Sequence, residues 1–178
     1  MDQAQQTPPP FLAFVGMGGN LGDVLSRLQS ALVGLDRLPW TRVLGVSSVY
    51  RTRPVDADGP DYLNAVGVLS CALGPLELLH ALLSLEREHD RTRPYWHAPR
   101  TLDLDLLWFG GAVRASDELT LPHPRMLTRA FVLEPLTELL ENQKMGVPPD
   151  LPWPTAEQRQ KWAQEQGIAK LIDARLMK

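Results

Sequence analysis

The chain has 178 residues, of which 44% are hydrophobic and 22% charged, and its formal net charge is −3. These values are typical of a folded globular protein of about one domain, and they exclude the disordered and fibrous classes. Because there is no excess of positive charge and no apolar run near the ~18 residues of a membrane span, we expect neither a nucleic-acid partner nor a membrane partner.

The predicted elements, in chain order, are a strand at 11–16, a helix at about 25–38, strands at 43–50 and 62–71, a helix from 75 to about 89, a strand at 101–109, a helix at 130–140 and a last helix from about 155 that includes Trp162, Ala169 and Ile172. The helices are predicted from apolar residues three and four positions apart, and the strands from β-branched content or alternation. Pro39 ends the first helix, and Pro75 suits the first turn of the second.

The order β-α-β-β-α-β predicts an α+β, ferredoxin-like fold, in which an antiparallel sheet has helices on one face, with additional C-terminal helices. We expect residues 1–10 to form a disordered lead, residues 11–145 to form the main domain, and residues 146–178 to form a helical extension of that domain.

The cysteine and lysine content limits which cellular compartment and which reaction mechanisms fit this chain. Cys71 is the single cysteine, and the first ten residues lack the basic and apolar regions of a signal peptide, so we expect a cytoplasmic protein. We also expect a monomer. All four lysines lie at or after position 144. A P-loop and Schiff-base chemistry both need a lysine at the site, so these mechanisms are excluded unless the tail folds into it.

An acidic pair is the strongest local signal. Asp103 and Asp105 alternate with leucines in the predicted strand 101–109, so both carboxylates point to one side, about 6.5–7 Å apart. Mg²⁺ binds through one or two carboxylates and completes its shell with water and substrate phosphates. Taken alone, the pair also fits a half-exposed strand whose solvent face is acidic.

Arginines precede the acidic pair in residues 86–100. Arg91, Arg93 and Arg100 can bind phosphate oxygens in a bidentate manner. The alternative is a solvated helix end with local ion pairs.

A second basic stretch, residues 122–131, contains His123, Arg125 and Arg129 and no acidic residue. It opens a predicted helix, and helix starts attract anions. The alternative is that the two arginines only coat a helix surface. Two carboxylates with two arginine clusters nonetheless match the requirements of phosphoryl transfer without a P-loop.

Glycines follow the first predicted strand as Gly16-x-Gly18-x-x-x-Gly22, with Asn20 available to hydrogen-bond a ligand. This spacing is a weak match to a dinucleotide-binding turn and leaves a small NADP-binding reductase as one alternative. A non-catalytic ligand-binding module is another, since ferredoxin-like folds serve many functions.

Four sequence motifs, in this order along the chain, resemble those of a known family. The motifs are GGNLGD at 18–23, SSVYRT at 47–52 with PDYLNA at 60–65, PRTLDLDL at 99–106, and LPHPRMLTRAF at 121–131. Together, over residues 11–140, they resemble the 6-hydroxymethyl-7,8-dihydropterin pyrophosphokinase family of folate biosynthesis. The resemblance implies a ferredoxin-like fold and transfer of the diphosphoryl group of ATP to the pterin's hydroxymethyl oxygen, which releases AMP.

The resemblance also implies roles for individual residues. Asp103 and Asp105 match ligands of two Mg²⁺ ions, with ATP as co-substrate. The positions that match contacts to ATP or its phosphates are Glu86, Arg91, Arg93, Arg100, His123 and Arg129. The positions implied for the pterin are Asn20, Thr52, Val55, Tyr62, Asn64 and Phe131, with Tyr62 and Phe131 stacking on the ring and Asn64 hydrogen-bonding its amide edge.

This chain departs from the usual family pattern at several points. Gly19 replaces a serine, Arg53 replaces a proline, and residues 93–100 form a loop one residue shorter, with Trp96 displaced by one position. We therefore expect a change in how that loop closes and no change in the acidic pair.

Overall fold

The computed structural model describes residues 10–54, 59–89, 101–171 and 176. Its main sheet consists of β1 (Phe11–Gly19), β2 (Thr41–Val46), β3 (Val49–Thr52), β4 (Tyr62–Cys71), β5 (Asp103–Phe109) and β8 (Ala169–Leu171). The helices are α1 (Val24–Asp36), α2 (Pro75–Glu88), α3 (Ala130–Asn142) and α4 (Ala156–Glu165). A small hairpin of β6 (Arg114–Ala115) and β7 (Thr120–Leu121), followed by a 3₁₀ turn at Met126–Thr128, precedes α3.

The sheet is antiparallel, with the order β5-β1-β4-β3-β8, and β2 pairs with β4 beyond the end of β3. This is the ferredoxin-like arrangement that the β-α-β-β-α-β order predicts, so the predicted fold class is confirmed. It places β1 between β5, at the edge of the sheet, and β4.

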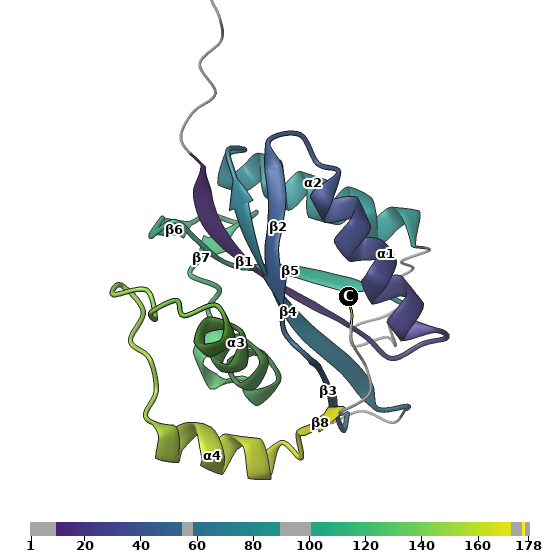
Figure 1. Ribbon diagram of the computed structural model, residues 1–178, viewed down its shortest axis with the longest axis vertical. Coiled ribbons are helices and arrows are strands. Elements are labelled where there is room, and N and C mark those ends of the chain that lie inside the picture. The colour runs from purple at the N-terminus through teal and green to yellow at the C-terminus, as the bar shows by residue number, and fades with distance from the viewer. Residues whose placement is uncertain (1–9, 55–58, 90–100, 172–175, 177–178) are drawn as a thin grey trace, which may run out of the picture.

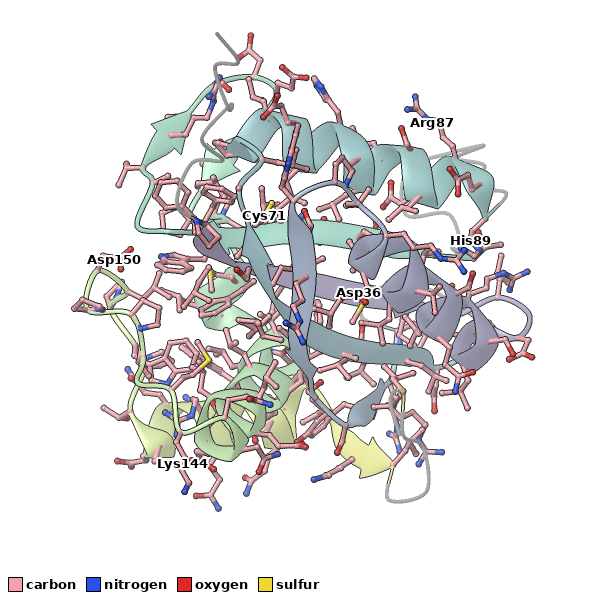
Figure 2. All side chains as sticks on the ribbon, turned by 45° about the horizontal axis from the view of Figure 1, so that its top comes forward. Asp36, Cys71, Arg87, His89, Lys144 and Asp150 are labelled. Carbon is pink, nitrogen blue, oxygen red and sulfur yellow. The ribbon has the colours of Figure 1, made fainter. Side chains whose placement is uncertain are left out.

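Helices cover both faces of the sheet rather than one (Figure 1). The helices α1 and α2 pack on one face over Ala13, Val15 and Met17 of β1, whereas α3 packs on the opposite face over Phe14. Figure 2 shows the same separation, with Arg87 beyond α2 and Lys144 beyond α3. The two helices of the β-α-β-β-α-β unit lie on one face, as expected, and the additional helix α3 covers the other face, because β1, β4 and β5 carry apolar side chains on both sides.

Several predicted elements differ in their extent. The first helix ends at Asp36, three residues before Pro39, and the strand predicted at 101–109 begins at Asp103. The strand predicted at 11–16 continues to Gly19, and residues 43–50 form parts of two strands, β2 and β3, with Ser47 and Ser48 between them. The last helix ends at Glu165 rather than continuing through Ala169, which lies in β8. In the described ranges, no helix is long and apolar enough to cross a membrane.

Candidate active site

Three of the predicted site residues, Asp103, Asp105 and Asn64, lie on the α3 face of the sheet. Across the strands, Asp103 pairs with Gly18, and Gly18 pairs with Asn64. Directly paired residues point to the same face, and neighbouring strands lie about 4.8 Å apart, so Asp103 and Asn64 face the same side about 10 Å from each other. In the next row on that face, Asp105 pairs with Gly16. Glycines therefore form the floor between the acidic pair and Asn64.

Gly18 is required by the close approach of a side chain. A Cβ atom at this position would lie 2.8 Å from Oδ1 of Asn64 and 3.3 Å from the carbonyl oxygen of Leu63. The missing side chain lets the Asn64 amide lie over β1. The sequence also suggested Gly16 and Gly18 as parts of a dinucleotide-binding turn. Both lie inside β1, so that interpretation is wrong and the alternative of an NADP-binding reductase has no structural basis.

The acidic pair faces a cation from the start of α3. Nη1 of Arg129 lies 3.7 Å from Oδ2 of Asp105, and the two side chains are 20% and 41% exposed. This exposure leaves Asp105 accessible to a ligand and weakens the ion pair through solvent screening. The predicted alternative of a purely solvated acidic face does not fit, because Arg129 comes from a segment packed against that face.

Glu86 supports the acidic pair from the other side of the sheet. Its side chain is buried between α2 and β5, and its Oε1 accepts a hydrogen bond of 2.7 Å from the backbone N–H of Leu104, between the two aspartates. This contact fixes the strand on which both carboxylates lie. The burial of Glu86 is consistent with this structural role. A direct contact between Glu86 and ATP stays a prediction.

His123 lies beside the acidic pair. Its backbone N–H donates to the carbonyl of Leu107 in β5 at 2.8 Å, and its Nδ1 accepts from the backbone N–H of Arg125 at 3.2 Å. Burial is the main cause that lowers the pKa of His123; Arg129 and Arg125 lower it further, and Asp105 opposes them. The ring is therefore neutral at pH 7, and because Nδ1 accepts, its proton is on Nε2.

The described residues among those predicted to bind the pterin lie on β3 and β4, directly after β1, and at the start of α3. Nδ2 of Asn64 donates to Oγ1 of Thr52 at 3.0 Å, and both residues are buried. Tyr62 pairs with Thr52 across β3 and β4. Asn20 donates to the carbonyl of Pro60 at 3.3 Å, two residues before Tyr62. These contacts bring four of the predicted residues to one end of the sheet.

Phe131 lies in the first turn of α3, next to Arg129. The guanidinium carbon of Arg129 lies 5.3 Å from the centre of the Phe131 ring, which is a cation–π distance. One short segment thus presents a cation to the acidic pair and an aromatic ring next to it.

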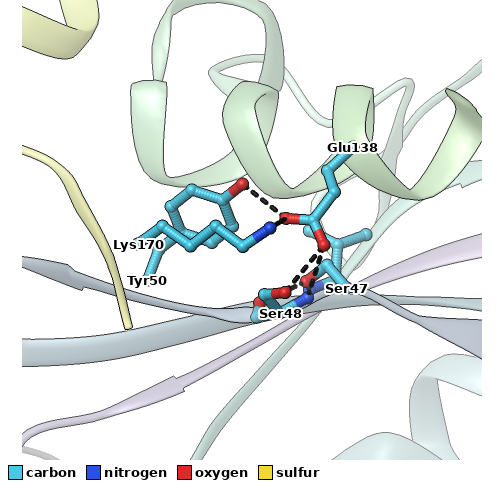
Figure 3. A network of polar contacts seen from close by, with 6 residues as sticks. Ser47, Ser48, Tyr50, Glu138 and Lys170 are labelled. Carbon is cyan, nitrogen blue, oxygen red and sulfur yellow. Dashed lines mark hydrogen bonds and ion pairs between the residues drawn. The ribbon is translucent and has the colours of Figure 1, made fainter. Parts of the chain in front are cut away.

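A polar network that the sequence analysis did not identify joins α3 to the sheet (Figure 3). Oε1 of Glu138 accepts from the N–H and the hydroxyl of Ser48, at 3.2 and 2.7 Å. Its Oε2 accepts from the hydroxyl of Tyr50 at 2.5 Å and pairs with Nζ of Lys170 at 3.1 Å. Burial alone would raise the pKa of Glu138, but these donors outweigh it and hold the pKa below its ordinary value.

A cavity of about 290 Å³ begins at the acidic pair and follows β5, the outer strand of the sheet. Asp105 and His123 line it together with leucines of α2 and β5 and with the β6–β7 hairpin, namely Leu79, Leu83, Leu104, Leu106, Leu119, Ser116, Asp117, Glu118, Thr120 and Pro124. Leucines form one part of its wall, and polar side chains of the hairpin together with Asp105 and His123 form the other, so the cavity can contact both apolar and polar parts of a small molecule. A larger cavity of about 670 Å³, between β3 and the α4–β8 segment, contains none of the predicted site residues.

Four predicted site residues lie outside the described residues, and they are Val55, Arg91, Arg93 and Arg100. The loop 93–100 with its one-residue shortening lies there as well. Their predicted roles therefore stay predictions.

The acidic pair fits a hard divalent cation by its donor chemistry. Asp103 and Asp105 are partly exposed carboxylates on one strand face, and Mg²⁺ needs only one or two such ligands besides water and phosphate. Within the described residues, no group of three or more histidine, cysteine or carboxylate side chains could enclose a metal without other ligands. An open site of this kind is compatible with a metal that arrives with a nucleotide.

The fold and the site together define an α+β protein of ferredoxin-like topology with a paired-carboxylate face next to a cavity for a small molecule. The family model of 7,8-dihydro-6-hydroxymethylpterin-pyrophosphokinase (HPPK) matches residues 14–141. The chain belongs to this family, as its sequence motifs predicted.

Individual relatives are named 2-amino-4-hydroxy-6-hydroxymethyldihydropteridine pyrophosphokinase. The Pseudomonas aeruginosa protein is 41% identical over 133 residues, which cover 74% of this chain and 82% of that protein. The Bacillus subtilis protein is 34% identical over 90% of this chain and 96% of its own length, so its match includes residues beyond α3. The Synechocystis protein is 44% identical, and the match covers 71% of this chain and 65% of the relative, just under two thirds of its length.

Solved structures support the fold. The crystal structure of Plasmodium falciparum HPPK-DHPS with SDX-DHP has a TM-score of 0.67 and 11% identity, and the match covers 88% of this chain and 45% of that chain. At this identity the likeness shows the fold alone.

Proposed function

We propose that this protein transfers the diphosphoryl group of ATP to the hydroxymethyl oxygen of 6-hydroxymethyl-7,8-dihydropterin and releases AMP. The observation that carries the proposal is the placement of Asp103 and Asp105 on one face of β5, with Arg129 beside them and the Asn64–Thr52 pair across a glycine floor. Charged groups for a polyphosphate and polar and aromatic groups for a heterocycle thus meet on one face. The names of the family and of its members support the pterin as the acceptor and the diphosphoryl group as the group transferred, and ATP as the donor is part of this proposal.

In this reaction the hydroxymethyl oxygen forms a bond to the β-phosphorus of ATP. The bond between that phosphorus and the oxygen bridging to the α-phosphorus breaks, AMP leaves with the bridging oxygen, and the hydroxyl proton is released. Asp103 and Asp105 would hold Mg²⁺, which when bound neutralises the negative charge of the triphosphate. Arg129 adds a positive charge at the same place, and catalysis is then mostly positioning and charge stabilisation.

The two substrates have separate places around the acidic pair. The cavity along β5 has apolar walls from Leu79, Leu83 and Leu119 and contains His123 at the end near Asp105, which suits the nucleoside part of ATP. The neutral His123 can donate from Nε2 to a phosphate or hydroxyl oxygen. On the other side, Asn64 offers an amide to the edge of the pterin, the hydroxyl of Thr52 holds that amide in place, and Phe131 offers a ring face.

A direct assay tests this proposal. The protein is incubated with ATP, MgCl₂ and 6-hydroxymethyl-7,8-dihydropterin, and AMP is measured, with omission of the pterin as the control. We expect AMP only when both substrates and Mg²⁺ are present. Binding of both substrates with no AMP would contradict the proposal and would support the alternative of a non-catalytic binding module.

A further inference from the structure

The start of α3 carries Arg129 and Phe131, and it has no cap of its own. An α-helix leaves its first N–H groups without partners inside the helix, and the side chain at the N-cap position usually accepts one of them. Arg129 occupies that position, and its side chain makes no capping hydrogen bond. It extends instead to Asp105 and over Phe131. The residue that faces the site therefore cannot also cap the helix.

Gln166, from the end of α4, takes over the capping. Its Oε1 accepts from the backbone N–H of Ala130 at 2.8 Å, and its Nε2 donates to the carbonyl of Thr128 at 3.0 Å. One amide group thus binds the backbone on both sides of Arg129. The two hydrogen bonds span 36 and 38 residues of sequence, so they belong to the tertiary structure and not to the helix.

The position of Gln166 is fixed by the turn that follows it. Gly167 has a φ of +59°, which favours glycine, and its N–H donates to the carbonyl of Gln164 at 3.2 Å. The N–H of Ile168 donates to the carbonyl of Ala163 at 3.1 Å. These two bonds form the Schellman motif that ends many helices. The turn directs the chain into β8, which pairs with β3.

A second contact holds α3 from the same segment. Lys170 of β8 pairs with Glu138, which lies seven residues after Phe131 and so about two helical turns further along α3 (Figure 3). The segment from α4 to β8 therefore contacts α3 at its start through Gln166 and near its end through Lys170.

We infer that Gln166 is a positioning residue of the active site. It fixes the backbone at Thr128 and Ala130, and it thereby keeps Arg129 beside Asp105 and Phe131 at the pterin side. This inference rests on the proposed function for its effect on substrates, but the capping itself is independent of any substrate. A residue that contributed only to global stability would change the folded fraction and leave the affinity of the folded protein unchanged.

The test uses the full chain and three variants. Gln166→Met has a similar length and lacks both hydrogen bonds, whereas Gln166→Glu keeps an acceptor for the Ala130 N–H and lacks the donor to Thr128. Gln164→Met is the matched control, because Gln164 is an exposed glutamine of the same helix. Hydrogen exchange of the Ala130 amide, followed by NMR without substrates, reports the cap. Steady-state kinetics report KM and kcat for ATP and for the pterin.

We expect Gln166→Met to accelerate exchange at Ala130 and to raise KM for both substrates, each by about tenfold, with a smaller change in kcat. Gln166→Glu falls between wild type and Gln166→Met, and Gln164→Met matches wild type. Unchanged exchange, or a loss of kcat with unchanged KM, overturns the inference. If the wild-type protein binds both substrates and releases no AMP, the proposed function is wrong. In that case the hydrogen exchange of the Ala130 amide still tests whether Gln166 caps α3.

Discussion

Replacing Gly18 by alanine tests the geometry of the site floor most directly. The new Cβ would lie 2.8 Å from Oδ1 of Asn64 and 3.3 Å from a backbone oxygen, so the Asn64 amide must move. Its movement breaks the 3.0 Å hydrogen bond to Thr52 in a buried place. Such a loss costs about 1–3 kcal/mol, and the lower entropy of the unfolded alanine chain returns about 0.5–1 kcal/mol. The net destabilisation is therefore about 1 kcal/mol, within a range of about 0–2.5 kcal/mol.

Gly16→Ala is the matched control, on the same strand and the same face. The atoms nearest to its Cβ would be Leu107 side-chain atoms at 3.5 Å or more, which is ordinary contact. We expect this variant to be neutral or slightly stabilising. With an m-value of about 2 kcal/mol per molar urea for a protein of this size, the unfolding midpoints of the two variants should differ by about 1 M.

The same pair of variants separates the two substrates. Gly18→Ala should raise KM for the pterin, because Asn64 and Thr52 lie at that side, and should leave KM for ATP near the wild-type value. Equal urea midpoints for the two alanine variants, or an equal effect on both substrates, would show that the contact between Gly18 and Asn64 does not shape the site.

Three further predictions concern the acidic pair, the buried network and pH. Asp105→Asn should reduce AMP formation at least about a hundredfold. The urea midpoint should change little, because the side chain of Asp105 is 41% exposed, and retained activity would rule out the metal role of Asp105. Glu138→Leu should lower the free energy of unfolding in urea by about 2–3 kcal/mol, because it leaves the donors of Ser48 and Tyr50 unpaired. Lys170→Met should lower it by less than about 1 kcal/mol. Equal losses of stability in the two variants would contradict this prediction. His123 has a pKa below its ordinary 6.5, so protonation favours the unfolded chain: its contribution to stability is complete above pH 6.5 and falls as the pH drops below it. The stability of His123→Gln relative to wild type should therefore increase from pH 7.5 to pH 5.5 in urea unfolding, and a constant difference would argue against a buried neutral ring.

Local sequence determined the helices and strands of this protein and the side chains that are available for its chemistry. Alternation placed Asp103 and Asp105 on one face of a strand, because side chains in a strand alternate whatever the strand pairs with. The order of elements was sufficient for the ferredoxin-like sheet, since short connections and antiparallel pairing leave few other arrangements. The family motifs lie in these same segments, so family membership also followed from the sequence.

Tertiary structure alone decided how those parts meet. The second apolar face of the sheet, the approach of Asn64 over Gly18 and the capping of α3 by Gln166 depend on residues far apart in the chain, and no local pattern encodes them. Gly167 is a local exception, because a glycine at this point of the sequence favours the end of a helix and so predicts the boundary between α4 and β8. Periodicity shows which side of an element is buried, but the partner on that side is chosen by packing, and packing is a property of the whole fold.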